Sequence, residues 1–174
     1  MRSEWEKIEV LEHVLAALTP QNRLACSVSL STGLRIGDVL SLKTEQLQKS
    51  NRFVIKEQKT GKRRQVYFTK ELREALLCQS GRIWVFENRL SPVHHRTRQA
   101  VYKDIRRAAA AFRVRKHISP HTMRKAFAVN FYKKCGNLGR VKDLLNHSSE
   151  AVTMIYAMAD VLTQKKVDKK KKIK

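Results

Sequence analysis

Residues 32–42 read Thr32-Gly33-Leu34-Arg35-Ile36-Gly37-Asp38-Val39-Leu40-Ser41-Leu42. The helix before this stretch is predicted to begin at Pro20, after the N-cap Thr19, and to break at Gly33. A short apolar helix is predicted to follow over residues 37–43. Arg35 lies between the two helices, with an aspartate three residues after it. This placement favours a functional arginine over one more surface cation.

The segments on either side of this stretch have clear local patterns. Ser3 and Glu6 have the spacing of a capping box, and apolar residues then follow at helical spacing. On the other side, two β-branched and aromatic runs, residues 53–55 and 66–68, flank Gly61. Such runs around a turn residue predict a β-hairpin.

The rest of the chain is predicted to be mainly helical. Thr69 is expected to cap a helix that runs to about Cys78, and a small strand is expected over residues 83–86. A loop is expected to start at Ser91-Pro92. Four further helices are predicted, over about 97–113, from Ser119-Pro120 to about 135, near 138–145 and near 149–157. Helices on both sides of a small antiparallel β-sheet indicate a mostly α fold with α+β character.

The charge balance points to a polyanionic partner. Lysine and arginine total 37, aspartate and glutamate total 15, and the formal net charge is +22. The tail at residues 165–174 holds seven lysines and one aspartate, so most of the excess belongs to the rest of the chain. This balance argues against an ordinary enzyme of small metabolites and predicts nucleic-acid binding that weakens with salt. A ribosome-like or merely solubilised basic protein is the alternative from charge alone.

The cysteines and histidines predict neither disulfides nor a metal site. Cys26, Cys78 and Cys135 are far apart, and their odd number without a visible targeting segment indicates reduced thiols. Cys26 and Cys78 lie in apolar runs and are expected in the core. His94-His95 has no further ligand at zinc spacing, so no metal is expected there.

Five motifs, in order, resemble those of the tyrosine recombinases, the phage integrase family. The stretch around Arg35 resembles their first arginine box, and Lys59, in Gln58-Lys59-Thr60-Gly61-Lys62, resembles the lysine of their β-hairpin. His121-Thr122-Met123-Arg124 matches the family's His-x-x-Arg motif. Leu144-Leu145-Asn146-His147-Ser148-Ser149 resembles its Leu-Gly-His box, and Tyr156 follows nine residues further on, at the nucleophile's spacing. The resemblance covers about residues 20–160.

The resemblance implies the catalytic-domain fold of this family, with residues 1–164 as the catalytic domain and residues 165–174 as a basic tail. Asn146 stands where the family usually has glycine, and asparagine tolerates left-handed backbone geometry. The family's separate N-terminal helical domain, which closes a clamp around DNA, is expected to be missing, and the chain is either an excised fragment or a natural minimal form. Its loss is expected to weaken DNA binding.

The catalytic residues implied by the resemblance are Arg35, Lys59, His121, Arg124, His147 and Tyr156. The two arginines would clamp the non-bridging oxygens of a DNA phosphate, because a guanidinium stays charged and matches phosphate bidentately. An ordinary phenol, with a pKa of about 10, is a poor nucleophile, and His121 is the candidate base. Lys59 would protonate the leaving 5′ oxygen, and His147 would hydrogen-bond a non-bridging oxygen. Asp38 would orient the Arg35 guanidinium.

Some assignments stay open in the sequence. Lys62 is an alternative to Lys59 as the general acid, because the register of a hairpin cannot be read to one residue. DNA contacts are predicted for a further set of cations, with a solvated helix side as the alternative: Lys62, Arg96, Arg98, Lys103, Arg106, Arg107 and Lys125.

The implied function is site-specific DNA recombination through a 3′-phosphotyrosyl intermediate, with no metal, cofactor or ATP. The expected partner is double-stranded DNA, and the family implies a homo-oligomer on it, a tetrameric synapse, although the domain alone could be a monomer. Two alternatives are type IB topoisomerase-like relaxation of DNA and a non-catalytic DNA-binding module of the same fold. A bacterial or phage-encoded cytoplasmic protein, associated with the nucleoid, is expected. No membrane association is expected, since no apolar run approaches the roughly 20 residues of a span.

Overall fold

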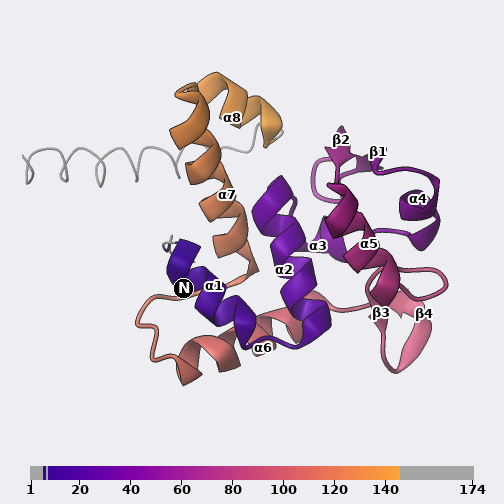
Figure 1. Cartoon of the computed structure of the whole chain (residues 1–174), viewed down its shortest axis with the longest axis horizontal. Helices are drawn as coiled ribbons and strands as arrows, with labels where there is room; N and C mark the ends of the chain where they lie inside the picture. Colours follow the sequence, from indigo (N-terminus) through magenta and orange to yellow (C-terminus); the bar gives the residue numbers. More distant parts are fainter. Residues whose placement is uncertain (1–5, 7, 146–174) are drawn as a thin grey trace, which may run out of the picture. The chain divides into compact units, whose positions relative to one another are not determined.

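The computed structural model describes residue 6 and residues 8–145. The chain divides into two compact units, Met1–Phe127 and Ala128–Lys174, and the boundary falls inside one helix. The helices are α1 (Ile8–Ala16), α2 (Pro20–Thr32), α3 (Ile36–Leu40), α4 (Thr44–Lys49), α5 (Lys70–Gln79), α6 (Arg98–Ala111), α7 (Pro120–Cys135) and α8 (Leu138–Leu144) (Figure 1). The strands are β1 (Arg52–Lys56), β2 (Arg63–Tyr67), β3 (Glu87–Asn88) and β4 (Ser91–His95). The described residues are thus mostly helical with small antiparallel sheets, as predicted.

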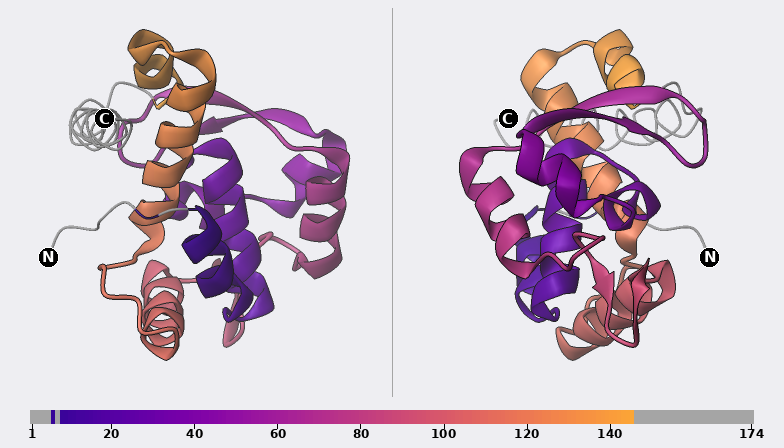
Figure 2. Two further views of the ribbon diagram at one scale, coloured as in Figure 1. Left: turned by 60° about the vertical axis from the view of Figure 1, so that its left-hand side comes forward. Right: turned by 90° about the vertical axis from the view of Figure 1, so that its right-hand side faces the viewer.

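The helices of the first unit pack around one apolar core. Helix α1 packs against α2 and α6, and α3 also packs against both of these helices (Figures 1 and 2). Helix α4 packs against α5. Core side chains come from both ends of this unit and include Leu11, Val14, Val28, Leu34, Leu40, Leu76, Phe86, Ile105 and Met123. Burial of these apolar groups is the main source of stability.

The β1–β2 hairpin alternates strictly between an outer and an inner face. Its antiparallel register pairs Phe53 with Val66 and Lys56 with Arg63. Ile55 and Val66 are buried, whereas the neighbouring residues in each strand are exposed. This period of two is the signature of a strand with one solvated face, and it confirms the predicted hairpin.

Two predictions for the middle of the chain are wrong. No strand spans residues 83–86, where only Trp84 forms an isolated bridge with Lys43. The Ser91-Pro92 segment begins strand β4 instead of a loop. The β3–β4 pair is two-stranded, so both strands are edge strands, where proline is tolerated. The Asn88 side chain accepts the N–H of Leu90 at 3.0 Å across the turn.

Two local features escaped the sequence patterns. Helix α4 has only six residues, and among its side chains only Thr44 and Leu47 are buried, too few for a periodic pattern.

Cys26 is buried as predicted, and burial raises its pKa to about 12. Cys78 is exposed, so the prediction that it is a core residue is wrong. Helix α5 turns its apolar side inward through Leu76 and leaves Cys78 outside.

Asp104 of α6 anchors the start of helix α2. Its Oδ2 accepts hydrogen bonds from the backbone N–H and hydroxyl of Thr19, both at 2.9 Å, and from Asn22 Nδ2 at 2.7 Å. Its Oδ1 accepts from Arg107 Nε and Nη2 at 3.1 and 2.7 Å. Burial acts to raise the pKa of Asp104, but these hydrogen bonds outweigh it and lower the pKa to about 2. Thr19 therefore precedes α2 as predicted, but its side chain bonds to Asp104 and makes no cap bond within the helix.

Asp104→Asn is expected to lower the free energy of unfolding at pH 7 by roughly 2 kcal/mol. The folded pKa lies below the unfolded value, so the stabilisation is complete above about pH 4 and is lost as the pH falls toward 2. Urea denaturation between pH 7 and pH 3 measures both effects. Glu74→Gln, at an exposed carboxylate of α5, is the matched control. A difference between parent and Asp104→Asn that does not change with pH would contradict the assignment.

The described part of the second unit contains the end of α7 and helix α8. Gly136 has a φ of 63°, and its N–H bonds to the Tyr132 carbonyl at 2.8 Å, which ends α7 as predicted. The Asn137 side chain accepts the N–H of Arg140 at 3.1 Å and caps α8. Val141 and Leu145 are buried. The predicted helix near 149–157 and the boundary at residue 164 lie outside the described residues.

Candidate active site

A glycine turn sets the position of Arg35. Gly33 follows α2 with a φ of 69°, and its N–H bonds to the Ser29 carbonyl at 2.9 Å. The buried Ser29 hydroxyl donates to the Leu34 carbonyl at 2.7 Å and fixes the far side of the turn. Arg35 then has extended backbone and is the N-cap residue of α3. Left-handed geometry favours glycine, so this turn needs Gly33, as the sequence predicted.

Arg35 forms an ion pair with Glu57, a carboxylate that is wholly buried at the end of β1. Arg35 Nη1 lies 2.7 Å from Glu57 Oε2, and Arg64 Nη1 lies 3.6 Å from Glu57 Oε1. The exposed fractions of the Arg35, Arg64 and Glu57 side chains are 15%, 7% and 0%. Burial acts to raise the pKa of Glu57, but hydrogen bonds from Thr60 and Arg35 outweigh it and lower the pKa. Glu57 is therefore ionised at neutral pH.

The turn of the β1–β2 hairpin carries both candidate lysines. Glu57 and Lys62 close the turn through a backbone bond of 2.9 Å, and Gly61, with a φ of 67°, donates to the Glu57 carbonyl at 2.9 Å. Thr60 Oγ1 donates to Glu57 Oε2 at 2.9 Å. Lys59 and Lys62 are both exposed on this turn. The choice of Lys59 over Lys62 as the general acid stays a prediction.

Asp38 connects α3 to the same turn. It is 3% exposed, and its Oδ1 accepts the backbone N–H of Gln58 at 2.8 Å. The pKa of Asp38 is raised, because burial disfavours its charged form. The hydrogen bond from Gln58 and the charges of Arg35 and Arg124 act in the opposite direction but do not outweigh burial. Arg35 hydrogen-bonds to Glu57 in this structure, so the predicted role of Asp38 in orienting Arg35 stays a prediction.

Arg124 reaches this loop from helix α7. Its side chain is 1% exposed, and Nη1 donates to the Gly33 carbonyl at 2.6 Å. Its position is set by the start of α7, where Pro120 is the first residue and the Thr122 hydroxyl accepts the Ser119 N–H at 3.1 Å. Arg35 and Arg124 both act electrostatically on Asp38. Two guanidinium groups 89 positions apart in the sequence therefore meet at one segment, because Arg35 belongs to it and Arg124 binds its Gly33 carbonyl.

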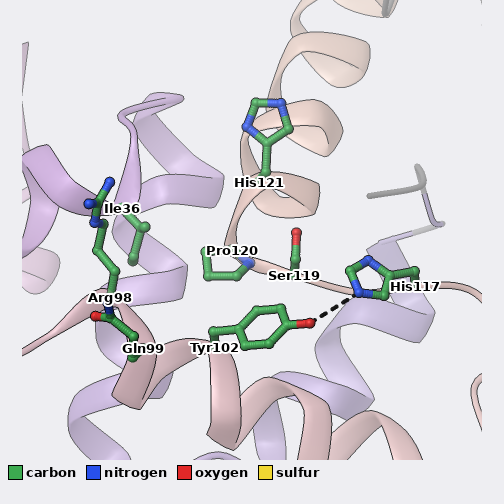
Figure 3. A pocket seen from close by; sticks show the side chains of 8 residues that line it. All are labelled: Ile36, Arg98, Gln99, Tyr102, His117, Ser119, Pro120 and His121. Atoms are coloured by element: carbon green, nitrogen blue, oxygen red, sulfur yellow. Dashed lines mark hydrogen bonds between the residues drawn. The ribbon is translucent and has the colours of Figure 1, made fainter. Parts of the chain in front are cut away.

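His121 lines a pocket beside this cluster (Figure 3). The pocket has a volume of about 550 Å³. Its lining comes from α3, α6, the segment before α7 and the start of α7: Ile36, Arg98, Gln99, Tyr102, His117, Ser119, Pro120 and His121. The Tyr102 hydroxyl and His117 Nε2 lie 3.2 Å apart. The pocket thus joins His121 to Arg98, which was predicted to contact DNA.

Gly37 allows three elements to meet at this pocket. A Cβ atom on Gly37 would lie 3.2 Å from Gln58 Oε1 and 3.5 Å from Arg98 Cδ. The second distance is an ordinary contact, but the first is tight, so even alanine would require the Gln58 side chain to shift by a few tenths of an ångström. Close approach of neighbouring groups is the reason for glycine here.

The predicted DNA-binding cations have different surroundings. Arg96 is bound within the unit, where Nε contacts Asn22 Oδ1 and Nη1 contacts Gln21 Oε1 at 3.1 Å. Arg107 donates to Asp104 and to the Ala17 carbonyl at 2.6 Å. A second group lies exposed along α6: Arg98, Lys103 and Arg106. Lys62 is exposed on the hairpin turn, and Lys125 is half-buried on α7.

Two predicted catalytic residues, His147 and Tyr156, lie outside the described residues.

Among residues 6 and 8–145, no group of three or more His, Cys, Asp or Glu side chains could hold a metal ion. No helix in the same part of the chain is long and apolar enough to cross a membrane.

The sequence prediction missed two charged residues of the site, Glu57 and Arg64. A signal for both was available in the alternation of the hairpin. Glu57 continues the inward face of Phe53 and Ile55, and Arg64 starts the inward face that continues with Val66. Opposite charges at two inward positions of one hairpin predict a buried ion pair.

Known proteins similar to this chain share one family. The model of the phage integrase family matches residues 6–162. The chain is 28% identical over 158 residues to the probable integrase/recombinase YoeC of Bacillus subtilis (strain 168), covering 89% of this chain and 87% of that protein. It spans about half the length of other curated relatives, 58% of a tyrosine recombinase from Thermosipho africanus and 50% of XerD from Lacticaseibacillus casei.

Two solved structures share the fold at low sequence identity. The XerH site-specific recombinase, bound to a palindromic difH substrate in a post-cleavage complex, matches with a TM-score of 0.73 and 22% identity, covering 94% of this chain and 52% of that one. A lambda integrase dimer bound to a COC′ core site matches with a TM-score of 0.70 and 19% identity, covering 88% and 59%. These likenesses show the fold alone, and they confirm the predicted catalytic-domain fold.

Proposed function

Because the chain belongs to the phage integrase family, that of the tyrosine recombinases, which cleave and rejoin DNA strands, we propose that it carries out site-specific DNA recombination. One observation supports this proposal above the others. Arg35, Arg124 and the Lys59 turn come from three separate segments and are connected through Asp38, Glu57 and the Gly33 turn. Buried, mutually arranged charges of this kind are typical of functional sites.

The proposed reaction proceeds in two transfers at one phosphate. The Tyr156 oxygen attacks the scissile phosphorus, loses its proton to His121, and forms a 3′-phosphotyrosyl bond as the bond to the 5′ oxygen breaks. Lys59 gives a proton to that leaving oxygen. A 5′ hydroxyl from another strand then attacks the phosphotyrosyl bond, reseals the DNA and releases the phenol. One phosphodiester is exchanged for another, so the reaction needs no ATP.

The arginines supply the stabilisation of charge in the transition state. Arg35 and Arg124 would each donate to the non-bridging oxygens, and His147 would add a third donor. Arg124 is held rigidly by its bond to the Gly33 carbonyl, and Arg35 by its ion pair with Glu57. Donors that are fixed before the reaction cost no reorganisation during it, which is the main source of their catalytic effect.

The proposed partner is double-stranded DNA. XerH and lambda integrase were each crystallised bound to DNA, the latter as a dimer, and the net charge of +22 fits such a partner. A tetramer on two DNA sites is the oligomer that the family implies for this chain. The similar curated proteins come from bacteria, and we place this chain with bacterial or phage DNA in the cytoplasm.

A nicked suicide substrate tests the proposal. The fragment downstream of the nick diffuses away after cleavage and traps the covalent intermediate. Incubation with a library of such duplexes in EDTA is expected to give a protein–DNA adduct that resists denaturation, and sequencing of the trapped DNA gives the preferred site. Supercoil relaxation without recombinant products would favour the topoisomerase-like alternative. DNA binding without any adduct would reject the proposed activity and favour a binding module.

Arg106→Gln is expected to weaken duplex binding about 3- to 10-fold near 0.1 M salt, because an exposed cation of α6 contacts a backbone phosphate. The slope of log affinity against log salt should fall in magnitude by about one. Fluorescence anisotropy at several salt concentrations measures both. Arg107→Gln is the neighbouring comparison, and its main effect should be a lower melting temperature, since Arg107 is bonded to Asp104 and Ala17. An unchanged salt slope for Arg106→Gln would remove that residue from the DNA-binding face.

A further inference from the structure

Glu57 is a wholly buried carboxylate that belongs to none of the sequence motifs and exchanges no proton or bond in the proposed reaction. Burial of a charge is costly, and such a charge is retained only with close partners. Here the partners belong to two different parts of the site. They are the Arg35 guanidinium next to α3 and the hairpin turn that carries Lys59.

A single oxygen of Glu57 connects these two parts. Oε2 accepts from Arg35 Nη1 at 2.7 Å and from Thr60 Oγ1 at 2.9 Å. Thr60 is the residue directly after Lys59. The backbone of Glu57 is bonded to the other end of the turn, through the Lys62 carbonyl and the Gly61 N–H, each at 2.9 Å. The carboxylate is therefore fixed at the base of the turn while its side chain reaches Arg35.

Arg64 supplies the second positive charge that this arrangement needs. Its Nη1 lies 3.6 Å from Glu57 Oε1, and its Nη2 donates to the Thr32 carbonyl. Because the positive charge of Arg64 remains beside it, Glu57 stays ionised even when Arg35 directs some of its N–H groups toward a phosphate. A guanidinium has five N–H donors, and the bond to Glu57 occupies Nη1.

We propose that Glu57 is a positioning residue that couples Arg35 to the Lys59 turn through Thr60. The inference rests on the proposed function. When Arg35 binds the scissile phosphate, the same carboxylate oxygen holds the turn so that Lys59 lies within reach of the leaving 5′ oxygen. Loss of this coupling lets the turn move. Misplacement of a general acid lowers the rate of cleavage, whereas binding of the phosphate by the arginines continues.

Thr60→Val removes the hydroxyl that donates to Glu57 and keeps the shape of the side chain. Thr60 is exposed, so the melting temperature should stay close to that of the parent. Thr60→Ser keeps a hydroxyl and is the matched control. The readout is the rate of adduct formation on two suicide substrates that differ only at the scissile linkage, one with the normal 5′ oxygen and one with a bridging 5′ sulfur. A thiolate leaves without protonation, so the sulfur substrate does not need the general acid.

Thr60→Val is expected to cleave the oxygen substrate about 10- to 100-fold more slowly than the parent and the sulfur substrate within about 3-fold of it. Thr60→Ser should restore the oxygen rate. Equal slowing of Thr60→Val on both substrates, or no slowing on either, would overturn the coupling while leaving the proposed function intact. Absence of an adduct from the parent on both substrates would instead overturn the proposed function.

Discussion

Tyr156→Phe is expected to abolish the covalent protein–DNA adduct completely. The phenol oxygen is the only atom of the side chain that can form the phosphotyrosyl bond, and phenylalanine keeps the ring but lacks that oxygen. The measurement is gel analysis of the suicide-substrate reaction under denaturing conditions. Duplex binding by the variant should be unchanged, because one neutral hydroxyl contributes little to an electrostatic interaction with DNA.

Tyr102 provides the sharpest control for this prediction. It lines the same pocket as His121, as Figure 3 shows, and its hydroxyl lies 3.2 Å from His117 Nε2. Tyr102→Phe should still form the adduct. If the adduct disappeared in Tyr102→Phe and persisted in Tyr156→Phe, the nucleophile would have been assigned to the wrong tyrosine.

Arg35→Ala is expected to slow adduct formation about 100- to 1,000-fold, which corresponds to roughly 3–4 kcal/mol for one strong preorganised donor. The fold should survive, because Arg64 still balances the charge of Glu57. Arg35→Lys keeps the charge but loses the planar fork and should recover only part of the rate. Single-turnover cleavage, duplex binding and thermal melting, measured together, separate these effects. A parallel loss of binding and cleavage would instead indicate a purely DNA-binding arginine.

Arg124→Ala tests the second arginine less cleanly. Its side chain is 1% exposed and satisfies the Gly33 carbonyl, so removal leaves a cavity and a buried acceptor without its donor. Cleavage should be lost and part of the DNA binding retained, but the melting temperature should also fall. Arg35 is therefore the better position for measuring the contribution of a guanidinium to the chemistry.

The extent to which the sequence predicted the site depended on the kind of signal. Local signals were reliable where the backbone conformation requires a particular type of residue. Gly33 and Gly61 have positive φ angles, and the Thr69 hydroxyl caps a helix by accepting the Leu72 N–H. Motif spacing predicted that Arg35 and Arg124 act together, and Arg124 binds the Gly33 carbonyl two residues before Arg35. The β3–β4 pair was missed because β3 has only two residues and β4 begins with Ser91-Pro92, which the sequence predicted as a loop.

Long-range polar partners could not be read from motif spacing. Nothing local assigns Arg107 to Asp104 or Arg96 to Asn22, because these bonds depend on how α6 packs near the start of α2. The Glu57–Arg64 pair was different. The alternation of inward and outward residues along the hairpin places both Glu57 and Arg64 on the inward face. The pair was overlooked because charged side chains are seldom expected on an inward face.

The buried charge pair of the hairpin also determines how its two strands can align. A slip of β1 by one residue would turn Lys56 inward and set it opposite Lys62 or Arg64, in either case two like charges. It would also expose Ile55 to water. Alternative pairings are therefore disfavoured by electrostatic repulsion as well as by lost apolar burial. The strand register therefore fixes the position of Lys59 on the turn. Residues of the strands, which take no part in the reaction, thus determine where this lysine lies.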